Sequence, residues 1–230
     1  MAFAANVNAA SLIESFDVLP AVAVGVVTTA PTGWTANNRS TNAAAATSGW
    51  FQGSPAVFPA FAGPTTNAYI GANFNNTTGE NTISNWLITP TLSYNNGDVV
   101  SFYSRTEVNP TSFADRLQLR FSNTGGTDVG ALPTDVGTST SLLVDINPTL
   151  SATGFPSVWT QYTATISGLS GPTNGAVAFR YFVTAGGPSG ANSNYIGIDS
   201  FSITPVPEPA AWLMMALGLG ALALRRKPKA

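Results

Sequence analysis

Cysteine and histidine are both absent from the 230 residues of this sequence. Without cysteine no disulfide can form, so the fold has to be stabilised by its core or by a bound ion. Without either residue, the chain cannot assemble a Ser–His pair, a Cys–His pair or an ordinary zinc site. Both lysines, Lys227 and Lys229, lie at the C-terminus, which excludes a Ser–Lys dyad. Only carboxylate chemistry remains open to an enzyme, and we predict a non-catalytic protein.

Charge is also scarce, because Asp, Glu, Lys and Arg make up 9% of the chain, against about 25% in an average globular protein. Residues 1–205 carry five arginines and ten carboxylates, which is a net charge of −5. This balance disfavours nucleic acid, whose phosphates require a basic surface. It is compatible with divalent cations or neutral glycans as partners.

One segment near the C-terminus is long and apolar. It covers residues 210–224 and is followed by Arg225-Arg226-Lys227. As a helix it would be about 22 Å long, which is short against a hydrocarbon core of about 30 Å. The pattern predicts a short transmembrane helix with a cytoplasmic C-terminus, leaving residues 1–205 outside. An amphipathic or buried helix is the alternative, although this segment has no polar face.

This tail resembles the PEP-CTERM sorting signal of Gram-negative bacteria, which combines a Pro-Glu-Pro motif, a short hydrophobic helix and a terminal basic cluster. Here the motif is Pro207-Glu208-Pro209, and the signal occupies residues 205–230. The resemblance implies that an exosortase, a membrane cysteine protease, cuts near the motif. It also implies an exported protein that is anchored transiently in the inner membrane and then reaches the cell surface or the extracellular polysaccharide.

The N-terminus does not show a complete export signal. Residues 1–5 contain no basic region and no apolar stretch of seven or more residues. Residues 1–10 are therefore interpreted as the remnant of an export signal or as a disordered N-terminus. Either the true start lies further upstream or the chain has been trimmed. Cytoplasmic residence is a third alternative, which the C-terminal segment disfavours. Residues 11–204 are long enough for one domain with a substantial core.

Alternating apolar residues and frequent turn signals predict an all-β domain, a sandwich or barrel. Asn96-Gly97 is a strong turn signal before a strand at 99–105, and a further strand is expected at 115–121. Within the last strand the apolar phase shifts by one residue, which predicts a β-bulge. Other strands are expected at 11–16, 69–74, 83–88, 159–169, 177–183 and 195–203, and long loops at 35–48, 53–66, 122–139 and 146–157.

The domain resembles the choice-of-anchor J group, which is related to cleaved-adhesin and MAM-like jelly rolls. The matching residues are Glu14-Ser15-Phe16-Asp17, Pro31-Thr32-Gly33-Trp34, Asn85-Trp86-Leu87-Ile88-Thr89-Pro90 and the blocks 100–105, 115–120, 159–162, 178–181 and 195–199. The resemblance implies a jelly-roll β-sandwich whose first and last strands lie side by side. That arrangement would bring Glu14 close to Asp199.

Three carboxylates are candidate ligands of a structural calcium ion: Glu14, Asp17 and Asp199. Two carboxylates with backbone oxygens suit Ca²⁺, which takes 6–8 oxygen ligands. The alternative is that each carboxylate caps a turn or pairs with an arginine. No Asp-x-Asp-x-Asp-Gly loop is present, so the sequence signal is weak.

A candidate ligand face comprises Trp50, Arg105 and Asp115. If strands 99–105 and 115–121 pair as a hairpin, Arg105 lies near Asp115. The alternative is ordinary cross-strand ion pairing, worth about 0.2–1 kcal/mol per pair. A glycoside hydrolase using Glu107 and Asp115 is a less favoured hypothesis. Trp50 lies in glycine-flanked sequence and is a candidate for exposure, whereas most of the other aromatic residues are expected in the core.

Overall fold

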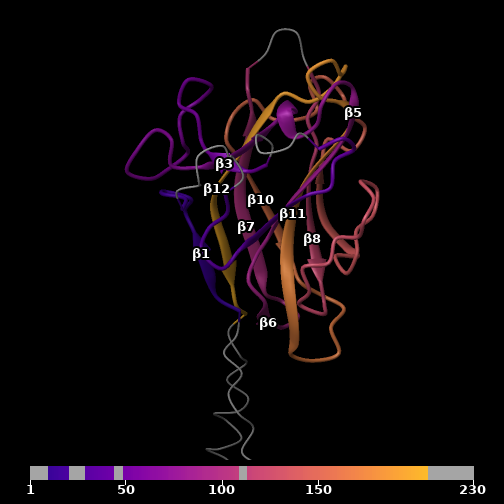
Figure 1. The fold of residues 1–230 in the computed structure, drawn as a ribbon. Helices are drawn as coiled ribbons and strands as arrows, with labels where there is room; N and C mark the ends of the chain where they lie inside the picture. The colour runs from indigo at the N-terminus through magenta and orange to yellow at the C-terminus, as the bar shows by residue number, and fades with distance from the viewer. Residues whose placement is uncertain (1–9, 21–28, 44–48, 109–112, 207–230) are drawn as a thin grey trace, which may run out of the picture.

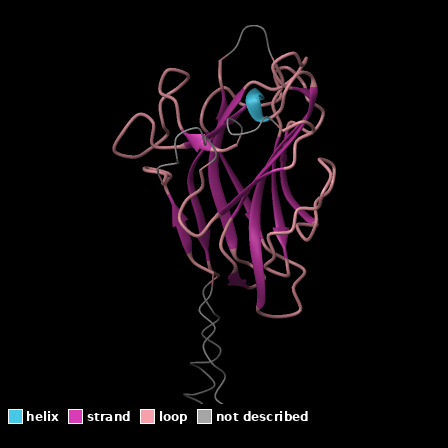
Figure 2. Cartoon of the chain, in the orientation of Figure 1, coloured by secondary structure: helices cyan, strands magenta, loops and turns pink. Residues whose placement is uncertain are grey.

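The computed structural model describes residues 10–20, 29–43, 49–108 and 113–206, which form two antiparallel β-sheets packed face to face (Figure 1, Figure 2). Within these ranges the only helix is the short 3-10 helix η1 (Phe74–Asn76). The predicted all-β jelly-roll sandwich is confirmed. No helix in the described ranges is long and apolar enough to cross a membrane, and the predicted helix at 210–224 lies outside them.

Each sheet has six strands, and we call the sheets A and B. Sheet A has the order β10 (Thr160–Thr165), β7 (Val99–Thr106), β12 (Tyr195–Thr204), β4 (Ile70–Asn73) and β3 (Phe51–Gln52), with β1 (Leu12–Glu14) also paired to β12. Sheet B has the order β2 (Thr35–Asn38), β5 (Asn81–Ile88), β11 (Thr173–Gly186), β8 (Leu117–Ser122) and β9 (Ser141–Ile146), with β6 (Leu92–Tyr94) also paired to β11.

The core lies between the inner faces of the two sheets. Phe179 on β11 makes edge contacts with Phe102 on β7 and Phe201 on β12, with ring centroids 4.9 and 5.5 Å apart. All three rings are fully buried. Burying each aromatic side chain contributes roughly 1.5–3 kcal/mol, and the edge geometry adds to it. These rings join the two sheets at their centre.

The predicted β-bulge is present in β12. The register between β12 and β7 shifts between Asp199 and Ser202, and Ser200 adopts a positive φ of 50°. β4 pairs with the part of β12 before the bulge, and β1 pairs with the part after it. The first and last strands therefore lie side by side, as the resemblance implied, with Glu14 opposite Phe201.

One predicted pairing is wrong. Strands β7 and β8 do not form a hairpin, because β7 lies between β10 and β12 in sheet A whereas β8 lies between β11 and β9 in sheet B. The chain between them crosses from one sheet to the other. Strand β2 also occupies part of the expected loop at 35–48. Its sequence, Thr-Ala-Asn-Asn, has little strand signal, and its backbone pairs with the edge of β5.

Candidate functional site

The sorting motif Pro207-Glu208-Pro209 and the basic residues Arg225, Arg226 and Lys227 lie outside the described residues. The described domain contains the other candidate positions. Of these, Arg105 and Asp199 lie on the outer face of sheet A, which faces away from the core, whereas Trp50 is buried in the core and Asp115 is buried where the two sheets meet. Each outer face is partly covered by a long loop.

The loop at 53–68 lies on the outer face of sheet A and is held there by Asp199. The buried carboxylate of Asp199 accepts hydrogen bonds at Oδ2 from the backbone N–H groups of Phe61 (2.9 Å) and Ala62 (3.2 Å). Its Oδ1 accepts from the Ser200 hydroxyl at 3.1 Å. Burial raises the pKa of Asp199, and these hydrogen bonds oppose that shift. The carboxylate thus fastens the loop to β12.

Aromatic rings fill the space beneath this loop. Phe58 stacks on Tyr69 at 5.1 Å and meets Tyr195 edge-on at 5.2 Å. The Arg105 guanidinium lies 4.4 Å from the centroid of the Phe58 ring. Trp159 donates its indole N–H to the Pro59 carbonyl at 2.9 Å. This part of the outer face is closed to ligands.

Beyond the edge of this loop, the outward side chains of β7, β10 and β12 are half-buried or exposed among the described residues. The rings of Phe61 and Tyr103 stack with centroids 3.7 Å apart and planes 16° apart, and Phe61 is 44% exposed. The Gln161 amide donates to the Ser101 hydroxyl at 3.0 Å. Neighbouring strands align these groups in cross-strand rows. We call the uncharged outward side chains here the neutral strip: Phe61, Ser101, Tyr103, Gln161, Thr163 and Ser202.

The neutral strip has the chemistry to bind an uncharged polyhydroxylated ligand. A ring with an exposed face offers apolar contact, and the hydroxyl and amide groups beside it both donate and accept hydrogen bonds. A shallow hollow of about 220 Å³, lined by residues 59–66, adjoins the Phe61 ring. The six side chains carry no charge, so they offer no ion pair to phosphate or carboxylate ligands.

The predicted ligand face of Trp50, Arg105 and Asp115 does not form one exposed surface. Trp50 is fully buried in the core, despite its glycine-flanked sequence. Arg105 is half-buried and donates to the Ser157 carbonyl at 2.5 Å. The expected pairing of Arg105 with Asp115 rested on the β7–β8 hairpin, and that hairpin is absent because the two strands belong to different sheets.

Asp115 is instead a buried acceptor where the two sheets meet. Its carboxylate accepts hydrogen bonds from the hydroxyls of Thr106 and Tyr181, both at 2.5 Å, and from the Asn194 N–H at 2.8 Å. Burial raises the pKa of Asp115, and these donors offset part of the shift. A carboxylate enclosed in this way does not face an open groove with Glu107, which a glycosidase pair requires.

The three candidate calcium ligands differ in how their oxygens are used. Glu14 accepts from the Phe16 N–H at 2.8 Å, and Asp199 holds the loop. Asp17 has a buried Oδ1 with no hydrogen-bond donor, and it lies against Gly63 of the same loop. The free oxygen of Asp17 fits a cation, whereas the N–H donors on the other two carboxylates fit a metal-free role. The described residues contain no group of three or more acidic side chains placed to hold a metal, so calcium stays a prediction.

The outer face of sheet B is built around a buried cation, Arg180, which is 2% exposed. Arg180 donates to the Ser84 hydroxyl at 3.0 Å, to Gln118 Oε1 at 3.3 Å and to the Pro133 carbonyl. Its guanidinium also lies over the rings of Trp86 and Phe182. Burial lowers the pKa of Arg180, and the nearby charges of Arg120 and Arg116 add to the effect.

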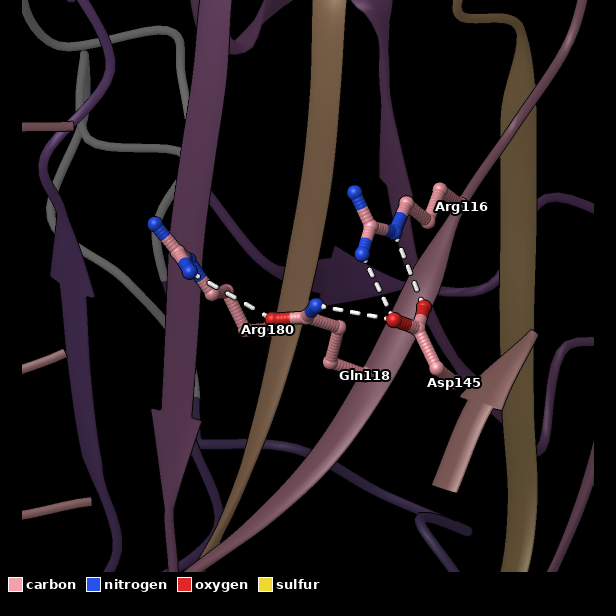
Figure 3. A network of polar contacts seen from close by, with 4 residues as sticks. All are labelled: Arg116, Gln118, Asp145 and Arg180. Carbon is pink, nitrogen blue, oxygen red and sulfur yellow. Dashed lines mark hydrogen bonds and ion pairs between the residues drawn. The ribbon is translucent and has the colours of Figure 1, made fainter. Parts of the chain in front are cut away.

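Figure 3 shows how this buried cation connects to the edge of the sheet. Gln118 donates to Asp145 at 3.2 Å, and Arg116 holds the same carboxylate with two hydrogen bonds of 2.8 and 2.6 Å. The loop that contains Pro133 packs Val129 and Val136 over Trp86 and Ile88. This face is therefore covered, and its polar groups bind one another.

Comparison with known proteins identifies the C-terminal signal. Residues 205–227 match the PEP-CTERM protein-sorting motif, which confirms the predicted signal and indicates an exported protein processed by an exosortase. Such processing places the protein at the cell surface or outside the cell. No curated protein matches the chain.

The domain has the fold of cleaved adhesin domains. The K1 cleaved adhesin domain of Lys-gingipain from Porphyromonas gingivalis W83 is 21% identical over 86% of this chain and 99% of that domain, with a TM-score of 0.53. The K3 domain of the same protein is 19% identical over 85% and 99%, with a TM-score of 0.51. At these identities the likeness establishes the fold, and binding has to be argued from the site.

Proposed function

We propose that the sandwich is a non-catalytic interaction module of an exported surface or matrix protein, and that it binds a neutral carbohydrate such as an extracellular polysaccharide. The observation that carries this proposal is the neutral strip, with the stacked Phe61 and Tyr103 rings at its upper end. The flat face of a sugar ring covers an exposed aromatic ring. Its hydroxyls then exchange hydrogen bonds with Gln161, Ser101 and Thr163.

The arrangement of charge supports a binding role over catalysis. Asp115 and Asp199 are buried and accept hydrogen bonds from the protein itself, and no carboxylate belongs to the neutral strip. A glycoside hydrolase needs two carboxylates about 5–9.5 Å apart on either side of the bond it cuts. The carboxylate-dependent hydrolase is therefore the weaker hypothesis for this domain.

Binding can be tested with a glycan array and with a pull-down on the exopolysaccharide of the host. Phe61→Ala removes the exposed ring and keeps the backbone N–H that Asp199 holds. Loss of a stacking contact worth about 1.4 kcal/mol weakens binding about tenfold. Phe113→Ala is the matched control, because this residue is 42% exposed and lies away from the strip, beside Phe74 and Pro188. Equal affinity of the Phe61 variant and the wild type would reject the strip as the site.

Sorting can be tested in cells. Before processing, the apolar segment at 210–224 would hold the protein in the membrane, and an exosortase would release it. Replacing Pro207-Glu208-Pro209 with three alanines should leave full-length protein in the membrane fraction, whereas wild-type protein is trimmed and released. A variant that is trimmed and released as before would exclude the processing proposal.

A further inference from the structure

The last strand of the domain leads almost directly into the sorting motif. Thr204, at the end of β12, pairs with Val99 of β7. Only Pro205 and Val206 follow before the motif begins at Pro207. The Cα atoms of consecutive residues are about 3.8 Å apart, so whatever contacts Val206 lies next to the motif.

Val206 is held to the body of the domain by two separate contacts. Asp98, fully buried in the turn before β7, accepts the Val206 N–H at Oδ1 at 3.0 Å and the Asn95 N–H at Oδ2 at 2.8 Å. The Val206 side chain also covers Gly97, where an added Cβ would lie 3.2 Å from Val206 Cγ2. Gly97 has a φ of 99°, so the turn favours glycine. We call Gly97, Asp98 and Val206 the terminal clamp.

The turn that carries the clamp is itself fixed to a neighbouring loop. The Gly97 N–H donates to the Ile166 carbonyl, and the Ile166 N–H donates to the Asp98 carbonyl, both at 2.8 Å. Asn96 exchanges two side-chain hydrogen bonds with the backbone of Leu169. The clamp is therefore joined by hydrogen bonds to the loop that follows β10.

Among the described residues, the two segments around the clamp carry no exposed charge. The turn at 95–98 and the loop at 166–172 contain one charged residue, Asp98, and its carboxylate is buried. The remaining side chains are amides, hydroxyls and small apolar groups. A surface without exposed charge can approach a membrane with little cost of desolvating charge.

We propose that Asp98 is a positioning residue for exosortase processing. By accepting the Val206 N–H, it fixes the residue that precedes the sorting motif at this end of the folded domain, and cleavage occurs C-terminal to Val206. The inference rests on the proposed processing and adds the requirement for a fixed junction. Holding the junction in place removes conformational freedom that the protease would otherwise have to restrict when it binds the motif.

The most direct test changes the link between Val206 and Pro207 without changing the folded domain. Four Gly/Ser residues inserted between Val206 and Pro207 keep the clamp and the motif but free the motif from the domain. Pulse–chase labelling in the exporting host should show processing about tenfold slower, with an unchanged melting temperature of the unprocessed protein in detergent.

The control carries the same insertion after Ser170, at the same end of the domain, and should be processed at the wild-type rate. Asp98→Asn, which keeps one acceptor oxygen for Val206, should be slowed less than Asp98→Ala.

The outcomes distinguish this inference from the processing proposal. If the triple alanine variant of the motif is still trimmed, processing by this motif is wrong. If that variant is blocked while the Val206 insertion is processed at or above the wild-type rate, the fixed junction is wrong and the clamp serves only stability. Mass spectrometry of the released protein should find the C-terminus beyond Val206, and an end before Val206 would also overturn the inference.

Discussion

The two outer faces of the sandwich use one buried charge each, of opposite sign, to hold a long loop. On sheet A, the carboxylate of Asp199 accepts backbone N–H groups from the loop at 53–68. On sheet B, the guanidinium of Arg180 donates to the Pro133 carbonyl and to two side chains of the sheet. In a protein with so few charges, these two buried groups each fasten a loop to its sheet.

The faces differ in what the loop leaves open. The sheet B loop packs apolar side chains over Trp86 and Ile88, and an ion pair of Arg116 with Asp145 occupies the edge beside it. The sheet A loop covers only the upper part of its face and leaves the neutral strip accessible. The difference is the reason why the proposed binding surface is assigned to sheet A and a stabilising role to the outer layer of sheet B.

The largest effect is expected from removing the buried cation. Arg180→Met replaces the guanidinium by an apolar side chain of similar length. It leaves Ser84, Gln118 and Pro133 without their hydrogen-bond donor. Each buried group without a partner costs about 1–3 kcal/mol, so the free energy of unfolding should fall by about 3 kcal/mol. Urea unfolding of the variant and the wild type measures this difference in free energy.

Arg120→Met is the matched control for that substitution. Arg120 is half-buried and donates a hydrogen bond of 2.9 Å to the Ser139 carbonyl. Its loss should cost about 1 kcal/mol. If the free energy of unfolding falls by a similar amount in both variants, the buried network at Arg180 contributes no more to stability than the single hydrogen bond of Arg120.

A calcium ion, if it binds, would strengthen the side of sheet A near the first and last strands. At 100 times its dissociation constant, an ion adds about 2.7 kcal/mol of stability. That corresponds to a melting shift of roughly 5–10 °C for a domain of this size. Chelator should lower the melting temperature and calcium should restore it. Asp17→Asn and Glu14→Gln should abolish this response, whereas Glu80→Gln should keep it. A domain indifferent to chelator would leave these carboxylates with structural roles only.

Removing the carboxylate anchor of sheet A should have a smaller, local effect. Asp199→Ala leaves the N–H groups of Phe61 and Ala62 without an acceptor, and we expect a loss of about 2 kcal/mol together with faster proteolysis within 53–68. Asp135→Ala is the control, because Asp135 accepts two backbone N–H groups in the same manner but in a half-exposed loop. That change should cost less than about 1 kcal/mol. If the Asp199 variant is cleaved within 53–68 no faster than the wild type, the aromatic rings beneath this loop are sufficient to hold it.

The smallest effect concerns pH. Because burial raises the pKa of Asp115, the folded state keeps this proton at pH values where the unfolded chain has lost it. The contribution of Asp115 to stability is therefore most favourable below about pH 3.9 and falls as pH rises through the folded pKa, by at most about 1.4 kcal/mol per pH unit. In Asp115→Asn, the Thr106 hydroxyl can turn toward the Tyr195 carbonyl, 3.0 Å away, and accept from the new amide. Urea unfolding across pH should show a flatter profile for this variant, and an identical profile would contradict the assignment.

Local patterns in the sequence were sufficient for several of these features. The alternation in β5, β7, β8 and β12 predicts strands because successive side chains of a strand point to opposite faces. The shift of apolar phase from Ile198 to Phe201 predicts the bulge by the same rule. The sorting signal is equally local, since its motif, apolar run and basic cluster are consecutive in the chain.

The pairing of strands and the exposure of individual side chains were decided only in the tertiary structure. Neighbours in sequence can lie in different sheets, as β7 and β8 do, so Arg105 and Asp115 are not cross-strand partners. Trp50 is buried because the core closes around it, and its flanking glycines carry no information about that. Phe61 and Tyr103 form the exposed stack because Asp199, far away in the chain, holds the loop in place. Contacts of this kind depend on three-dimensional packing, which no local sequence pattern encodes.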